Sequence, residues 1–152
     1  MKCHQTQKQE KGFTLIELLL SIIIIVAIVG FATPIYQNFQ VKNDLNLAAS
    51  TVVQTLRRAQ VLSQASDGNS SWGVKLQAGS ISLFQGNDYL SRNTNYDEVF
   101  ELSNNIDSSS GIEEVVFTKF TGLPDTTGNV ILTIPNGDTK TITINQKGMI
   151  EY

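Results

Sequence analysis

A long apolar run near the N-terminus constrains this chain more than any other feature. From Phe13 to Thr33 the sequence holds one ionisable residue, Glu17, and consists otherwise almost wholly of aliphatic side chains. As an α-helix these roughly 21 residues would extend for about 32 Å, enough to cross the hydrocarbon core of a bilayer. A helix on a soluble core needs a polar stripe, and Ile22–Val26 offers none. The run therefore predicts a membrane-embedded helix.

An ordinary membrane anchor leaves two residues of this region unexplained, Gly12 and Glu17. The lysines ahead of the run would hold the N-terminus in the cytoplasm by the positive-inside rule, as in any anchor of this orientation. A carboxylate inside the bilayer is costly and usually has a function. The alternative for Glu17 is a side chain that snorkels to the cytoplasmic headgroups.

A cleaved secretory signal is another interpretation of the same run. The flank is basic, and Gly30-Phe31-Ala32 supplies a small-x-small cleavage pattern. However, the apolar core of a secretory signal is about 7–15 residues long. This run is longer and contains Glu17, so its length disfavours the secretory interpretation.

The residues at the start of the run resemble a processing motif. Lys11-Gly12-Phe13-Thr14-Leu15-Ile16-Glu17-Leu18 is similar to the prepilin cleavage and methylation motif of type IV pilins and type II secretion pseudopilins, and the likeness extends to Gly30. The resemblance implies that a prepilin peptidase cuts between Gly12 and Phe13 and that Phe13 becomes N-methylated. It also implies assembly with other pilin or pseudopilin subunits on an inner-membrane assembly platform.

Such cleavage would give Glu17 a counter-charge. The new α-amino group at Phe13 has a reference pKa of about 7.7–8.0, and methylation keeps its charge. In a bundle of staggered helices, the amine of one subunit can meet Glu17 of the next. The attraction in low dielectric reaches several kcal/mol, of which desolvation offsets much. An unpaired carboxylate in lipid is penalised, so we expect Glu17 to set the register of assembly.

Composition excludes several other classes of function. Without residues 1–12 the chain would keep 8 Lys and Arg against 13 Asp and Glu, a net charge of about −5, which does not favour nucleic-acid binding. Cys3 and His4 are the only residues of their types and both precede Gly12. The processed chain would therefore lack disulfides, Cys or His metal ligands and a Ser/His/Asp or Cys/His nucleophile. We predict no enzyme, no cofactor and no metal.

Beyond the apolar run the helical pattern continues with an amphipathic period. Pro34 is expected to kink or loosen the helix. Apolar residues then recur every three or four positions and share one face: they are Val41, Leu45, Ala48, Val52, Leu56, Ala59 and Leu62. Asp67-Gly68-Asn69-Ser70 is a strong stop signal. The stripe is expected to pack on a globular domain.

The remainder of the chain has the alternation and turn signals of β-strands. Strands are expected at 72–76, 81–84, 98–102, 113–118, 130–134, 139–144 and around Met149-Ile150. Asn136-Gly137 lies between two β-branched runs and is a strong hairpin signal. The fold class is therefore α+β: a long N-terminal helix whose stripe covers one face of an antiparallel sheet domain.

A second resemblance concerns this β region. Leu56–Ser63 ahead of Trp72-Gly73-Val74, then Phe117–Gly122 and Lys147–Ile150, are similar to H-type minor pseudopilins. With the first motif, this implies a prepilin leader (1–12), a transmembrane and assembly helix (13–34), its amphipathic continuation (35–66) and an extracytoplasmic β domain (67–152). The implied function is a minor structural subunit near the filament tip. Both a type II secretion pseudopilus and a type IV pilus fit.

A pilus-associated DNA- or surface-binding subunit is the alternative function. Members of the family with a basic C-terminal tail are thought to bind DNA, but the tail here, Lys147–Tyr152, holds one Lys and one Glu. Salt-dependent binding by the domain from about residue 40 onward would support this alternative.

The other candidate site residues are expected to have structural roles. They are the Arg57-Arg58 pair, the turn residues Asp125, Asn129 and Asp138, the indole of Trp72, and the Glu113-Glu114 pair. The arginines are expected on a solvated helix face. The turn residues lack the spacing of a calcium loop and are expected to bond their own backbone. The indole is expected in the core. Adjacent glutamates on a strand would point to opposite faces and form no catalytic pair.

Overall fold

Helix α1 runs from Leu15 to Ala65 in the computed structural model, which describes residues 12–152 apart from the side chains of 31–38 and 109–110. The helix continues through Pro34, and the loosening expected there falls on residues whose side chains lie outside the described ones. The chain divides into two compact units between Asn38 and Phe39, and α1 contributes to both.

The part of α1 that follows Phe39 buries the stripe that the sequence predicts. Its buried members are Leu45, Ala48, Val52, Leu56 and Ala59, while Val41 and Leu62 pack at the margin. Ala49 and Val53 are also buried and widen the stripe. A face this broad can carry a sheet on each side, because it covers more of the helix than a single row of residues would.

The end of α1 is where the stop signal predicted it. Ser66 adopts a left-handed conformation with φ 55°, and the 3₁₀ turn η1 (Asp67–Asn69) follows. Ser63, fully buried in the last turns of α1, joins the helix to the first strand. Its Oγ accepts a hydrogen bond from the Trp72 N–H at 2.9 Å and donates one to the Trp72 carbonyl at 3.3 Å. The helix end and the start of the strand are thereby held together.

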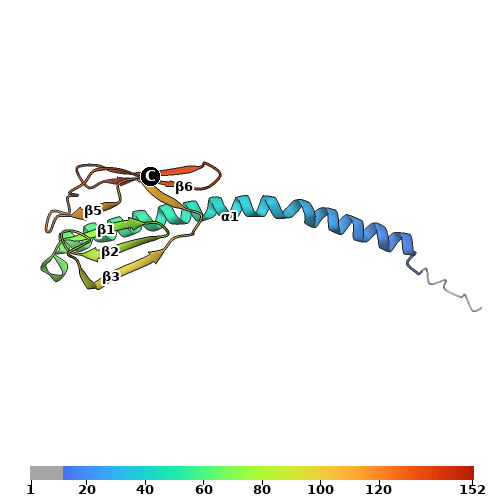
Figure 1. Cartoon of the computed structure of the whole chain (residues 1–152), viewed down its shortest axis with the longest axis horizontal. Coiled ribbons are helices and arrows are strands. Elements are labelled where there is room, and N and C mark those ends of the chain that lie inside the picture. The colour runs from blue at the N-terminus through green and yellow to red at the C-terminus, as the bar shows by residue number, and fades with distance from the viewer. Residues whose placement is uncertain (1–11) are drawn as a thin grey trace, which may run out of the picture. The chain divides into compact units, whose positions relative to one another are not determined.

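Within the described residues the rest of the chain forms eight strands in two antiparallel four-stranded sheets. The first sheet has the order β3-β2-β1-β5 and the second β4-β6-β7-β8. Their bounds are β1 Trp72–Gln77, β2 Ser80–Gln85, β3 Asn93–Glu101, β4 Asp107–Gly111, β5 Glu114–Phe117, β6 Gly128–Thr133, β7 Thr139–Ile144 and β8 Ile150–Glu151. The predicted class, a long helix followed by antiparallel strands, is confirmed. The single sheet face that the sequence suggested is instead two sheets beside α1 (Figure 1).

One core lies between α1 and both sheets. Alternate residues of each strand point inward, which accounts for the register: Val74 of β1 faces Leu83 of β2 and Val115 of β5. From the second sheet Val130, Leu132, Ile142, Ile144 and Ile150 join the same cluster. Trp72 is 4% exposed and its Nε1–H donates to the Asp67 carbonyl at 3.0 Å, which confirms the predicted core position.

One hairpin agrees with expectation and two strands differ from it. The β6–β7 hairpin closes around the predicted Asn-Gly turn, with Gly137 at φ 85°. By contrast β4 (Asp107–Gly111) was not predicted, because its Asp, Ser and Gly residues have low strand propensity. It forms through pairing with β6 at Asp107–Thr133 and Gly111–Val130. β3 begins five residues before the predicted start at 98.

The outer face of the first sheet is covered by the β2–β3 loop. Phe84 is fully buried although it points away from α1, and a Cβ at Gly73 would lie 2.5 Å from its ring. Gly73 therefore makes room for Phe84. Tyr89 closes over Phe84 with ring centroids 5.5 Å apart in an edge-to-face geometry. This loop positions the start of β3.

Candidate assembly segment

The predicted processing site lies directly ahead of α1. Phe13 is 79% exposed, and among the described residues nothing beyond its chain neighbours comes within 4 Å of the position of a Cβ at Gly12. The peptide bond between Gly12 and Phe13 is thus accessible on its described side. The preceding residues 1–11 lie outside the described part of the chain.

Glu17 lies in the first turn of α1 with its side chain exposed. The Thr14 carbonyl accepts hydrogen bonds from the N–H groups of Glu17 and Leu18 at 3.1 and 3.2 Å, so Thr14 is the N-cap. A carboxylate here also interacts favourably with the helix dipole. The spacing Thr14-x-x-Glu17 is a capping-box pattern, a signal for the helix start that the sequence reasoning missed.

Among residues 12–152, no cation forms an ion pair with the Glu17 carboxylate in the isolated chain. The hydroxyl of Ser21, one turn later, forms its hydrogen bond within the helix: its Oγ donates to the Glu17 carbonyl at 2.8 Å. The two polar side chains of this segment therefore differ: Ser21 needs no external partner, whereas Glu17 has a charge to satisfy.

The apolar part of α1 is exposed all round. Each large apolar side chain described between Phe13 and Val29 is at least 47% exposed. They are Phe13, Leu15, Ile16, Leu18, Leu19, Leu20, Ile22, Ile23, Ile24, Ile25, Val26, Ile28 and Val29. A helix that is apolar on every side requires an apolar environment, either lipid or other helices.

Where side chains are described, no helix has both the length and the apolar content needed to cross a membrane. The span predicted from the sequence extends to residue 33, and the side chains of residues 31–38 lie outside the described ones.

The arginine pair lies on an exposed face of α1, as predicted, but both side chains also bond to the β domain. Arg58 makes a two-pronged contact with Glu98 of β3, Nη1 to Oε2 at 2.7 Å and Nη2 to Oε1 at 2.5 Å. Arg57 Nη2 donates to the Ile150 carbonyl of β8 at 3.4 Å. Each arginine ties α1 to one of the two sheets, and the helical period alone does not reveal partners 40 or more residues away.

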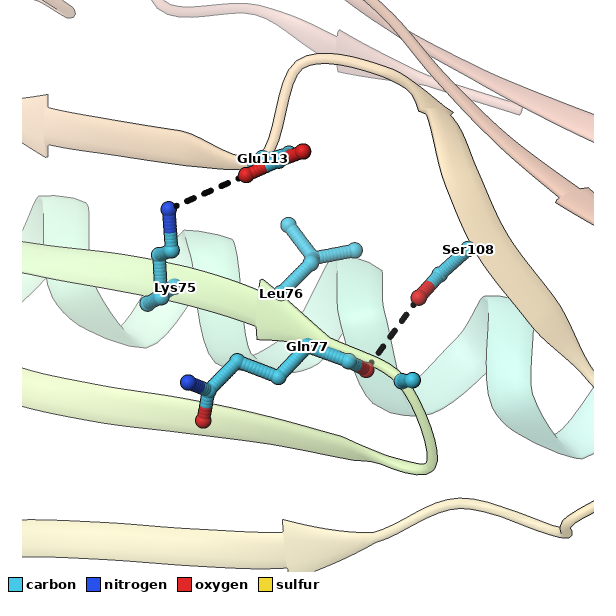
Figure 2. A pocket seen from close by; sticks show the side chains of 6 residues that line it. Lys75, Leu76, Gln77, Ser108 and Glu113 are labelled. Carbon is cyan, nitrogen blue, oxygen red and sulfur yellow. Dashed lines mark hydrogen bonds and ion pairs between the residues drawn. The ribbon is translucent and has the colours of Figure 1, made fainter.

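The glutamate pair also departs from expectation. Glu113 precedes β5 instead of lying in it, so strand alternation does not separate it from Glu114. Lys75 Nζ contacts both carboxylates, at 3.2 and 3.6 Å. Figure 2 shows Lys75 and Glu113 at a hollow of about 300 Å³, across from Ser108. Ser108 Oγ donates to the Gln77 carbonyl at 3.2 Å, which makes it a structural donor and not an activated nucleophile.

The residues weighed for calcium have separate roles. The Asp125 carboxylate accepts a hydrogen bond from the Val116 N–H at 2.8 Å, beside β5. Asp138, in the β6–β7 turn, forms an ion pair with Lys42 of α1 at 3.1 Å. The Asn129 carbonyl accepts from the Ile112 N–H at 2.9 Å. Within the described residues, no three His, Cys, Asp or Glu side chains gather as metal ligands.

Gln60 connects α1 to two loops of the β domain, a role that the sequence did not predict. Its Nε2 donates to the carbonyls of Gly122 and Gly148, each at 3.1 Å. These glycines lie in the stretches 117–122 and 147–150, on which the H-type resemblance rests. The structure thus brings those stretches together on α1. The sequence does show a glycine after each of two strands. It does not show that both glycines meet Gln60, because these contacts are long-range.

The β2–β3 loop is held by charge. The Asp88 carboxylate is hydrogen-bonded by the Ser91 hydroxyl and backbone, which holds its pKa below the ordinary value. The Arg92 guanidinium donates to Asp97 at 2.8 Å and stacks over Tyr89, and the Asp97 contact raises the pKa of Arg92 further.

Comparison with known proteins agrees with this geometry. Residues 7–33 match the family model of the prokaryotic N-terminal methylation motif. The minor pseudopilin EpsH from the type 2 secretion system of Vibrio cholerae has a similar structure, with a TM-score of 0.52 at 10% identity, covering 71% of this chain and 94% of EpsH. No curated protein matches in sequence. The chain therefore carries the N-terminal methylation motif ahead of a fold similar to that of the minor pseudopilin EpsH.

Proposed function

We propose that the chain is a minor structural subunit of a type II secretion pseudopilus or type IV pilus. A prepilin peptidase cuts it between Gly12 and Phe13, Phe13 is N-methylated, and the inner-membrane platform moves the subunit from the membrane into a filament. The N-terminus lies in the cytoplasm before cleavage, and the β domain lies outside. The observation that carries this proposal is the exposure of every large apolar side chain described from Phe13 to Val29.

Two environments can cover such a helix in turn. Before assembly, lipid covers it. Helices in lipid gain no hydrophobic free energy from one another, so the subunit can be stored as a monomer. Extraction into water would expose each aliphatic side chain at a cost of about 1.5–3 kcal/mol. Burial against neighbouring helices in a filament removes that cost, and cohesion of the filament follows.

Glu17 supplies the register of this packing. Its carboxylate has no cation partner within the described part of one chain, and cleavage creates the Phe13 ammonium. Aliphatic surfaces alone permit sliding, whereas a charge pair in low dielectric is satisfied at one stagger only. Neighbouring subunits are therefore held at the offset that joins amine to carboxylate.

The structure does not favour the DNA-binding alternative. Arg57 and Arg58 are exposed, but both bond to the β domain, and the charge of Arg58 is already paired with Glu98. Type IV pilins and pseudopilins are structural proteins, and we propose no enzymatic activity.

The processing step has a direct test. Expressed with a prepilin peptidase, the chain is expected to lose residues 1–12 and to begin at N-methylated Phe13, as measured by intact mass. Gly12→Leu is expected to block this cleavage, because a side chain would then occupy the cleaved position. The matched control is Gly30→Leu, which removes the small residue of the secretory pattern and should leave processing unchanged. A mature N-terminus just after Ala32 would overturn the proposal.

A further inference from the structure

The two edges of the first sheet differ in whether another segment of the chain covers them. At β5 the following segment closes the edge: the Thr118 N–H donates to the Leu123 carbonyl at 2.8 Å, and the Asp125 N–H donates to the Val116 carbonyl at 2.9 Å. The nine-residue β3 is the opposite edge. Apart from β2, no described segment forms backbone hydrogen bonds with β3. An open edge of this length offers a row of unpaired N–H and C=O groups.

A groove lies between this edge and α1. It consists of two adjoining hollows of about 140 and 260 Å³ that share Thr51. Leu47, Thr51, Gln54 and Arg58 line the helix side, and Phe100 and Glu101 of β3 line the other. The helical residues are spaced by three or four and thus form one face. Leu47 is 64% exposed on that face, so the sheet stops short of covering it.

The charges of the groove select its occupant. Glu98 is neutralised by Arg58, and Asp97 by Arg92. Asp44 and Glu101, which line the same hollow, have no cation partner among the described residues. β3 itself contains no Lys or Arg, so β3 of a second copy would supply no cation to Asp44 or Glu101. A basic segment is favoured instead.

We infer that β3 and this groove bind an extended segment of a partner protein, rich in Lys or Arg and in β-branched residues, that adds to the first sheet beside β3. Main-chain hydrogen bonds along β3 supply affinity, as in other cases of strand addition. Aliphatic side chains cover the exposed face of α1 at Leu47, and cations meet Asp44 and Glu101. The inference depends on the compact unit from Phe39 to Tyr152 and not on the proposed assembly into filaments.

A peptide titration tests it. The full chain in detergent micelles is titrated with a blocked hexapeptide of alternating lysine and valine and followed by NMR. We expect amide shifts in β3 and along residues 44–54, and slower hydrogen exchange in β3. Two control peptides should not bind: one with glutamate in place of lysine, and one with methylated backbone nitrogens, which cannot complete the strand hydrogen bonds.

Substitutions in the chain separate charge from shape. Glu101→Gln and Asp44→Asn are each expected to weaken the lysine–valine peptide about three-fold, the effect of one exposed ion pair. Glu151→Gln, an exposed carboxylate on β8, is the matched control and should bind as the unaltered chain does. Equal binding of the N-methylated peptide, absence of shifts in β3, or β3 shifts on raising the protein concentration alone would each overturn the inference.

Discussion

Replacement of Glu17 by alanine is expected to leave cleavage intact and to lower the amount of the chain in sheared filaments by about ten-fold or more. The physical reason is the charge pair. Alanine removes the carboxylate and leaves the Phe13 ammonium buried without a partner, which costs several kcal/mol in a low-dielectric bundle. A ten-fold change in an equilibrium corresponds to only about 1.4 kcal/mol. A charge pair whose attraction is largely cancelled by desolvation would therefore still produce this loss. Immunoblots of filament and membrane fractions measure it.

Two further variants isolate the charge. Glu17→Gln keeps the size and polarity of the side chain and removes its charge, so it should assemble as poorly as Glu17→Ala. Ser21→Ala, one turn away, should assemble normally, because the Ser21 hydroxyl is bonded within its own helix. If Glu17→Ala enters filaments as well as the unaltered chain does, Glu17 does not set the register.

Leu56→Ala is expected to destabilise the β domain by about 2–5 kcal/mol, the range measured for fully buried leucines. Leu56 is 0% exposed and lies in the stripe that packs on both sheets. Domains of ordinary size are stable by about 5–15 kcal/mol, so the loss is a large fraction of the total. Denaturant unfolding in detergent, followed by the fluorescence of the chain's one tryptophan, Trp72, measures it.

The same helix supplies the control. Leu47→Ala makes an identical chemical change nine residues earlier, at a side chain that is 64% exposed. Surface substitutions usually change stability by less than about 0.5 kcal/mol, so the unfolding midpoint should hardly move. Equal loss in the two variants would show that Leu56 does not lie in the core described above.

Much of the fold followed from local sequence patterns. The apolar period from Val41 to Leu62 predicted which face of α1 is buried, because helical spacing alone decides which side chains share a face. The Asn136-Gly137 turn predicted the β6–β7 hairpin for a similar reason: its strands are neighbours in the sequence, and the turn residues adopt the required backbone conformation.

What could not be predicted depends on long-range contacts. β4 consists of Asp, Ser and Gly residues and exists because β6 pairs with it. The division of the strands between two sheets likewise follows from the way both pack on one helix. At the level of single residues, the contact of Arg58 with Glu98 and the meeting of Gly122 and Gly148 at Gln60 join segments 40 to 88 residues apart.

The candidate site divides in the same way. The motif from Lys11 to Glu17 was readable because its residues act in one short segment, and the methylation-motif family model matches that region. The partner of Glu17 cannot be read from one chain, since we propose that it belongs to a neighbouring subunit. The open edge of β3 emerged only when the strand order was known.

N-terminal mass spectrometry of filaments sheared from cells that carry the chain and its assembly machinery tests the proposed function most directly. We expect the filaments to contain the chain beginning at N-methylated Phe13, with residues 1–12 absent. Filaments that exclude the processed chain, or that contain it with residues 1–12 still attached, would contradict the proposal that cleavage before Phe13 produces an assembling subunit.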